Sequence, residues 1–115
     1  MKKKVETAYG VIGLGRFGEA LAMMLAQSGH EVIAVDKDEK KVKEMRQYTD
    51  CAFVADNLSS DTLKEIGIQN CDVVIICIGE KVDVSVLTTM SVIEMGVPRV
   101  IAKALSPEQG AVLSK

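Results

Sequence analysis

The sequence has few of the residues on which metal, redox and covalent chemistry depend. It contains one histidine and three cysteines, and none of the cysteines stands in a CxxC spacing. We expect Cys51, Cys71 and Cys77 to be buried thiols that act as small apolar side chains, and not disulfide partners or metal ligands. His30 falls in a predicted turn on the side of the fold away from the glycine-rich turn described below. We therefore predict neither a metal site nor catalytic residues.

Long apolar runs and an excess of one charge are also absent. No apolar stretch approaches the roughly 18 residues of a membrane span, and the basic start at residues 1–4 lacks the apolar run of a signal peptide. Fourteen basic and sixteen acidic residues give a net charge of −2, which argues against binding to DNA or RNA. With 48% apolar and 26% charged residues, we expect a globular protein that stays in the cytosol.

What the sequence does have is a glycine-rich turn between an apolar strand and a helical pattern. The turn reads Gly13, Leu14, Gly15, Arg16, Phe17, Gly18, which is a GxGxxG spacing. In such turns the first glycine permits a tight bend, the second lets the backbone approach a pyrophosphate, and the third allows close packing of helix on strand. Free N–H groups at the start of the helix then meet the phosphate charge. The turn therefore predicts a phosphate site.

An acidic residue follows at the distance expected of a ribose-binding carboxylate. Asp36 stands 18 residues after Gly18, at the end of the apolar run 32–35. A carboxylate there accepts hydrogen bonds from both ribose hydroxyls, whereas a 2′-phosphate would bring negative charge against it, which disfavours NADP. Lys37 either softens that repulsion or is simply solvated. The turn and the carboxylate together predict a nucleotide site more specifically than either alone.

Five apolar runs rich in valine and isoleucine alternate with helical patterns. They lie at about residues 8–12, 31–35, 52–55, 73–78 and 99–104. Near-continuous apolar strands joined by helices predict a parallel sheet covered on both faces. Right-handed crossovers and the dinucleotide turn after strand 1 together predict a Rossmann-like doubly wound α/β sheet of order 3-2-1-4-5, with the nucleotide at the carboxyl edge where strands 1 and 4 part.

Capping residues predict where the helices begin and end. The first helix ends at Gly29, and Asp38 caps a second helix from Glu39 to about Tyr48. Ser59 or Ser60 caps a third helix, which ends near Gly67. Asp83 opens a fourth helix from Val84 to Glu94, which Gly96 closes, and Ser106-Pro107 begins a fifth. Residues 1–115 form one domain, and the sequence stops before a sixth strand. We expect it to be part of a longer protein.

The carboxyl ends of the other strands add candidate site residues. They are Asp56 with its neighbours Ala55 and Asn57, Gly79 with its neighbour Ile78, and Lys103. Asp56 either accepts a hydrogen bond from the adenine amine or caps the following loop as an Asx turn. Gly79 is a turn glycine that would also leave space for ribose or phosphate. The charge of Lys103, at the end of an apolar strand, needs a partner. A phosphate or a carboxylate of a neighbouring subunit would supply one, or else the side chain extends into solvent.

Arg16 is the residue best placed to choose among ligands. Its guanidinium could fork onto phosphate oxygens and would then favour ligands with more terminal phosphate charge. The alternative is a solvent-facing side chain, although a cation at a helix N-terminus is unfavourable unless an anion offsets the helix dipole.

With these residues assembled, the chain resembles the N-terminal nucleotide-binding domain of the regulators of potassium conductance, called the KTN, TrkA-N or RCK domain. It resembles in particular the cytosolic gating subunits of Ktr and Trk potassium uptake systems. The resemblance covers nearly the whole chain and rests on Val11 to Gly18, Gly29 to Asp36, Ala55-Asp56, Asp72 to Gly79, Leu87 to Thr89, and Ile101 to Ala104. The order and spacing of these strings are more specific than any single one.

The resemblance implies a regulatory protein and not an enzyme. It implies ATP/ADP or NAD(H) as ligand, with phosphates on Gly13, Gly15, Arg16 and Gly18, ribose on Asp36 and adenine near Asp56. It also implies homodimers that assemble into an octameric ring under a membrane-embedded potassium transporter subunit, and a C-terminal regulatory domain that this chain does not include. The alternative is the NAD-binding domain of an oxidoreductase whose catalytic domain is missing, because the same turn and carboxylate serve dehydrogenases.

Overall fold

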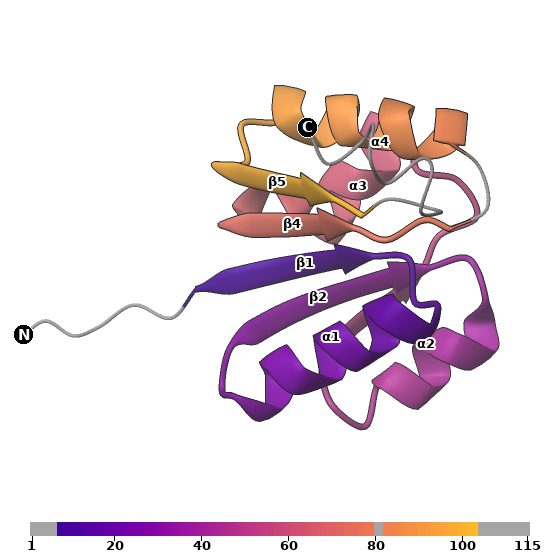
Figure 1. Ribbon diagram of the computed structural model, residues 1–115, viewed down its shortest axis with the longest axis vertical. Coiled ribbons are helices and arrows are strands. Elements are labelled where there is room, and N and C mark those ends of the chain that lie inside the picture. The colour runs from indigo at the N-terminus through magenta and orange to yellow at the C-terminus, as the bar shows by residue number, and fades with distance from the viewer. Residues whose placement is uncertain (1–6, 80–81, 104–115) are drawn as a thin grey trace, which may run out of the picture.

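The computed structural model describes residues 7–79 and 82–103. Strands and helices alternate along this part of the chain (Figure 1). Their bounds are β1 Ala8–Ile12, α1 Arg16–Gln27, β2 Glu31–Asp36, α2 Glu39–Met45, β3 Cys51–Val54, α3 Ser60–Ile66, β4 Val73–Ile76, α4 Val82–Glu94 and β5 Arg99–Ala102, with a short 3-10 turn at Ile68–Asn70. The predicted fifth helix at Ser106-Pro107 lies outside the described residues.

All neighbouring strands of the sheet are parallel, and their order is β3-β2-β1-β4-β5. This order confirms the predicted Rossmann-like α/β fold. The pairing continues past the end of β1, where the Gly13 amide donates to the Val35 carbonyl at 2.8 Å and the Cys77 amide donates to the Ile12 carbonyl at 2.7 Å. The glycine-rich turn is therefore anchored between its two neighbouring strands.

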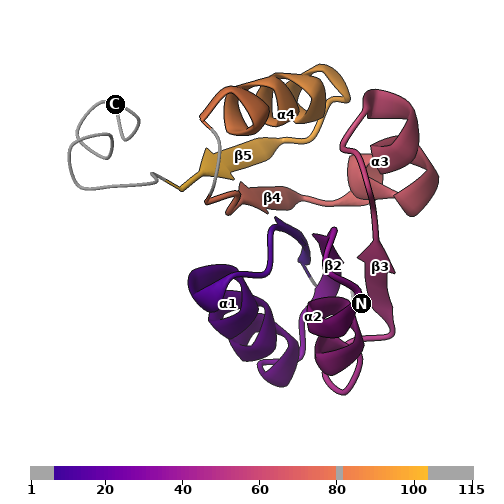
Figure 2. The same ribbon diagram turned by 90° about the vertical axis from the view of Figure 1, so that its right-hand side faces the viewer.

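Helices cover both faces of the sheet. Figure 2 shows α1 and α2 on one face and α3 and α4 on the other. Successive strand residues alternate between the faces, so that Val11 packs with α1 and α2 while Ile12 packs with α3 and α4. Because both faces are covered, both residue sets are apolar, and this explains the near-continuous apolar runs of the sequence.

Most predicted helix ends are confirmed. Gly29, Gly67 and Gly96 all have φ between +91° and +101°, as expected of glycines that end helices. The Asp38 side chain accepts a hydrogen bond from the Lys40 amide at the start of α2. The Ser59 side chain caps α3, so that Ser59 and not Ser60 is the cap.

Several element bounds differ from the predictions, among them the end of β5, which lies at Ala102 and not at 104. The second helix ends at Met45 and not near Tyr48, because the amides of Gln47 and Tyr48 donate three residues back, to the carbonyls of Glu44 and Met45, and form turns instead of a further α-helical turn. The fourth strand ends at Ile76 and not at Ile78, and the apolar Cys77 and Ile78 beyond it line the cleft. The fourth helix begins at Val82, so Asp83 lies in its first turn and does not precede it.

Two of the three cysteines are buried and one is exposed, whereas the sequence predicted that all three are buried. Cys71 and Cys77 are buried as expected, and burial, the largest cause in each case, raises the pKa of both thiols to about 11. Both therefore stay protonated at neutral pH. The prediction for Cys51 is wrong, because this residue is exposed at the start of the edge strand β3, which has no outer neighbour in the described sheet.

Other sequence expectations are tested only within residues 7–79 and 82–103. No helix in these ranges has the length and apolar character needed to cross a membrane. No cluster of His, Cys, Asp and Glu side chains in them could hold a metal ion. His30 follows a turn before β2, and its ring packs edge-on against Tyr9 with centroids 5.1 Å apart.

Candidate nucleotide-binding site

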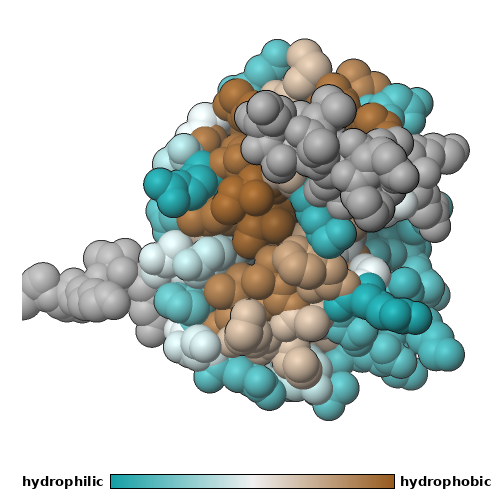
Figure 3. All heavy atoms as spheres, viewed as in Figure 1, coloured by the Kyte–Doolittle hydropathy of each residue, from teal (hydrophilic) through white to brown (hydrophobic). Residues whose placement is uncertain are grey.

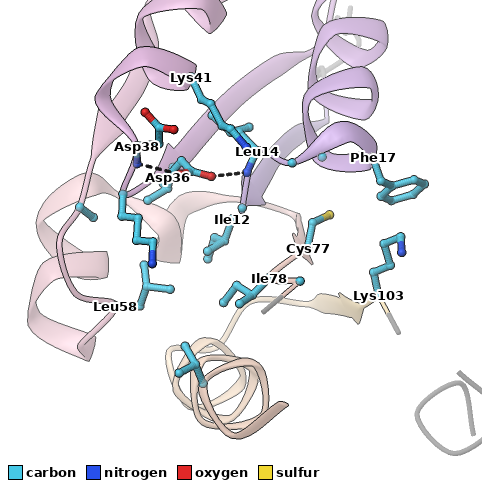
Figure 4. Close-up of a pocket in the computed structure, with 18 of the residues that line it drawn as sticks. Ile12, Leu14, Phe17, Asp36, Asp38, Lys41, Leu58, Cys77, Ile78 and Lys103 are labelled. Atoms are coloured by element: carbon cyan, nitrogen blue, oxygen red, sulfur yellow. Dashed lines mark hydrogen bonds between the residues drawn. The ribbon is translucent and has the colours of Figure 1, made fainter. Parts of the chain in front are cut away.

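The carboxyl ends of the strands face a cleft of about 790 Å³ (Figure 4). This volume lies in the range of small-molecule and cofactor sites. The structure brings every predicted site residue to this cleft: Gly13, Leu14, Gly15, Arg16, Phe17, Gly18, Asp36, Lys37, Ala55, Asp56, Asn57, Ile78, Gly79 and Lys103. Their contact with a ligand stays a prediction.

Two glycines of the turn are required by the packing of the fold itself. Gly13 has φ of +103°, and a Cβ on it would lie 2.6 Å from the carbonyl oxygen of Cys77. A Cβ on Gly18 would lie 1.9 Å from the carbonyl oxygen of Gly13 and 3.3 Å from the Cβ of Cys77. These contacts hold the start of α1 tightly against β1 and β4, as the first and third glycines of such a turn require.

The middle glycine is different, because nothing in the protein crowds it. No heavy atom lies within 4 Å of a Cβ built on Gly15, whose φ of −69° and ψ of −167° any residue can adopt. Gly79, on the other side of the cleft, is equally open. The packing of the described residues therefore gives no reason for a glycine at position 15, whereas close approach of a ligand to the backbone would give one.

Asp36 joins the glycine-rich turn to the turn that follows β2. Its Oδ2 accepts a hydrogen bond from the Leu14 amide at 2.6 Å, and its Oδ1 accepts one from the Asp38 amide at 2.8 Å; Figure 4 shows the link to Leu14 as a dashed line. A carboxylate has about four acceptor positions, so both oxygens can accept further donors. The residue predicted to hold ribose thus also fixes the loop predicted to hold phosphate.

The Asx turn at the end of β3 belongs to Asn57. Its Oδ1 accepts hydrogen bonds from the Ser59 amide at 3.1 Å and the Thr62 hydroxyl at 3.0 Å. The predicted Asx turn into the loop before α3 is therefore present, and Asn57 forms it. Asp56 is exposed and lines the cleft, and its contact with adenine stays a prediction.

Phe17 and Lys103 meet at one side of the cleft (Figure 4). Lys103 Nζ lies 5.3 Å from the centroid of the Phe17 ring, within the range of a cation–π contact. The Lys103 amide donates to the Ile76 carbonyl at 2.8 Å, which fixes the backbone of Lys103 beside the end of β4. The aromatic ring is a partner for Lys103 that the sequence did not predict. Arg16, the first residue of α1, is exposed and lines the cleft nearby.

Comparison with known proteins shows the family to which the chain belongs. The family model described as the TrkA-N domain matches residues 9–115. The chain belongs to the TrkA-N domain family. This membership confirms the family resemblance predicted from the glycine-rich turn, Asp36 and the later strand ends.

Curated relatives of this TrkA-N domain include potassium uptake proteins. Ktr system potassium uptake protein C of Bacillus subtilis is 41% identical over 115 residues, which are 100% of this chain and 50% of that protein. Ktr system potassium uptake protein A of Vibrio alginolyticus is 40% identical over 113 residues, 98% of this chain and 51% of that protein. The chain therefore spans about half the length of these relatives.

Solved structures share the fold of the domain. The NAD(P)-binding domain of an exopolyphosphatase-related protein from Archaeoglobus fulgidus has a TM-score of 0.72 at 21% identity, covering 92% of this chain and 79% of that one. The TrkA-N domain of inner membrane protein ybaL from Escherichia coli has a TM-score of 0.58 at 14% identity, covering 87% and 90%. At these identities the likeness shows the Rossmann-like fold alone.

Several residues that line the cleft of this TrkA-N domain were missed from the sequence. They are Ile12, Val35, Asp38, Lys41, Leu58, Cys77 and Val84. Lys41 is half-buried, whereas Lys40 and Lys43 of the same helix are exposed. No local signal marks it, because Lys41 and the exposed Lys43 both adjoin the buried Val42, and only the rotation of α2 on the sheet separates them.

The charges that line the cleft are mixed and slightly cationic. Four basic side chains face three carboxylates, whereas the whole chain is slightly acidic. The basic residues are Arg16, Lys37, Lys41 and Lys103, and the acidic ones are Asp36, Asp38 and Asp56. This cleft suits a ligand that carries both phosphate charge and neutral hydroxyl or amine groups.

Proposed function

We propose that this chain is the nucleotide-sensing domain of a cytoplasmic regulatory subunit of a potassium uptake system. The observation that carries the proposal is the cleft in which the glycine-rich turn and Asp36 are hydrogen-bonded to each other. Membership of the TrkA-N family and the similarity to Ktr system potassium uptake proteins support it. The ligand is an adenine nucleotide, ATP/ADP or NAD(H), with its phosphates at the turn and its ribose at Asp36.

Regulation in this proposal requires binding but no chemical reaction. The domain assembles with further copies of itself, and the nucleotide favours one arrangement of neighbouring copies over another. A ligand shifts such an equilibrium only when it binds the two arrangements with different affinity. A factor of about 10 in affinity, or about 1.4 kcal/mol, already gives a measurable bias. The movement then gates a membrane-embedded transporter subunit, which holds the domain at the inner face of the membrane.

The alternative of a truncated oxidoreductase has less support. An imine reductase from Myxococcus stipitatus, solved in complex with NAD+, has a TM-score of 0.64 at 20% identity, covering 85% of this chain and 32% of that one. At that identity only the fold is shared. Within the described residues no histidine or tyrosine lines the cleft, so two residue types that often act as acid or base in hydride transfer are absent there. We therefore propose that this chain is not an enzyme.

Arg16 is expected to distinguish ATP from the other nucleotides. In thermal-shift titrations of the wild-type protein, ATP, ADP, NAD and NADH should each raise the melting temperature, and at equal concentration the tighter ligand should raise it more. Arg16→Ala should then weaken ATP binding by about 10-fold, and NAD binding by less, because a guanidinium contributes most where terminal phosphate charge is greatest. Equal losses for all four ligands would remove Arg16 as the discriminating residue. No stabilisation by any of them would overturn the proposed function.

The exposed side of α4 is the surface that we propose for self-association, into homodimers and then an octameric ring. It carries large apolar side chains that are 43% to 64% exposed, namely Val86, Leu87, Met90 and Ile93. Figure 3 shows apolar side chains on α4 and more of them over β4 and β5. A contiguous apolar surface of this kind marks an interaction site.

Met90→Lys should therefore weaken self-association by about 10-fold or more, because a charge would be buried at the contact. Met24→Lys is the matched control, since Met24 of α1 is 57% exposed and Met90 is 52% exposed. Sedimentation velocity over a range of protein concentrations measures both variants. A wild-type protein that stays monomeric, or equal behaviour of the two variants, would rule out α4 as the contact.

A further inference from the structure

Lys41 occupies a place in the cleft that the phosphate and ribose roles above leave unassigned. It lies in the first turn of α2, is half-buried, and lines the cleft together with Asp36. Figure 4 shows its side chain running from α2 toward the point where Asp36 meets Leu14. Among the lysines of α2 it is the one that reaches the cleft, since Lys40 and Lys43 are exposed and do not line it.

Two side-chain carboxylates fix the position of α2 relative to Asp36. Asp36 Oδ1 accepts the Asp38 amide at 2.8 Å, and Asp38 Oδ1 accepts the Lys40 amide at 2.9 Å. Val42 and Met45 are fully buried against the sheet and prevent the helix from rotating. The Lys41 side chain is therefore directed into one region of the cleft, toward the place where Asp36 meets Leu14.

The chemistry of a ribose hydroxyl calls for such a pair. A hydroxyl donates one hydrogen bond and accepts up to two, whereas a carboxylate only accepts and an ammonium only donates. Asp36 can accept a hydrogen bond from the hydroxyl, but a carboxylate cannot donate one to the lone pairs of the hydroxyl oxygen. An ammonium beside Asp36 supplies that donor, and a hydrogen bond from a charged group is stronger than one between neutral groups.

We propose that Lys41 donates a hydrogen bond to a ribose hydroxyl, and that the same hydroxyl donates a hydrogen bond to Asp36. The two residues together then select ribonucleotides over deoxyribonucleotides. The proposal rests on the proposed nucleotide-binding function and names the part of the ligand that this end of the cleft recognises. The selected chemical class is an adenine nucleotide with its ribose hydroxyls intact.

The test compares ADP with 2′-deoxy-ADP and 3′-deoxy-ADP by calorimetry on the wild-type protein and on Lys41→Met. Methionine keeps most of the length of the side chain and removes its charge. The variant should bind ADP about 10-fold more weakly than wild type, as expected for loss of a charge-assisted hydrogen bond. It should bind one of the two deoxy analogues as well as wild type does, because that analogue lacks the hydroxyl that Lys41 would contact.

Two further variants separate a specific contact from a change of net charge. Lys40→Met removes the same charge from an exposed position one residue away and should leave all affinities unchanged. Lys41→Arg restores a donor and should recover at least part of the ADP affinity. Equal weakening of ADP and of both analogues by Lys41→Met would show only a general attraction for phosphate and would overturn the proposal, as would unchanged ADP affinity. Absence of binding by the wild-type protein would overturn the proposed function as well.

Discussion

Gly15→Ala is expected to weaken the binding of adenine nucleotides by about 100-fold or more while the protein stays folded. A methyl group at this position projects into open space over the cleft and not into the protein. A diphosphate seated on the turn would be displaced by that methyl group and would lose hydrogen bonds from backbone amides. Each such bond to a charged group contributes about 1.5 to 3 kcal/mol, so losing two accounts for the expected effect.

The same substitution should change the free energy of unfolding by less than about 1 kcal/mol. Gly15 precedes α1 with backbone angles open to alanine, and the gain from a stiffer unfolded chain offsets the poorer helix cap. Chemical denaturation measures this quantity, and calorimetry with ADP and NAD measures the loss of binding. Gln27→Ala, at the opposite and exposed end of α1, is the control and should change neither. Wild-type affinity in Gly15→Ala would place the phosphates away from the turn.

The residues that define this cleft were predictable where the signal is local in sequence. The glycine spacing of the turn and Asp36 after a run of apolar residues depend on neighbouring positions. Strand order follows from the dinucleotide turn after the first strand together with the handedness of crossovers. Each predicted site residue therefore reaches the same cleft.

What the sequence did not predict depends on how distant elements pack. Asp36 accepts the Leu14 amide across 22 positions of the chain, and no local pattern indicates that bond. Lys41 differs from its neighbouring lysines only through the rotation at which α2 lies on the sheet. Cys51 has the apolar character of a buried residue, but its exposure is decided by its place at the start of an edge strand.

Gly18→Ala is expected to lower the free energy of unfolding by at least about 3 kcal/mol, much more than Gly15→Ala does. The added methyl group would lie 1.9 Å from the carbonyl oxygen of Gly13, and that carbonyl belongs to a turn anchored to both neighbouring strands. Neither the backbone of the turn nor Cys77 beneath it is the end of a flexible side chain, so relief requires α1 to move off the sheet. Overpacking of this kind costs about 1 to 3 kcal/mol where the structure can relax and more where it cannot.

Chemical denaturation should therefore show a clear fall in the midpoint for Gly18→Ala beside a nearly unchanged midpoint for Gly15→Ala. For a domain of 115 residues, a loss of 3 kcal/mol corresponds to a fall in melting temperature of roughly 12 °C. The two substitutions add the same methyl group three residues apart in one turn, so their contrast separates the glycine kept for packing from the glycine kept for the ligand. A midpoint for Gly18→Ala equal to that of the wild-type protein would mean that α1 does not approach β1 as closely as the tight contact at Gly18 requires.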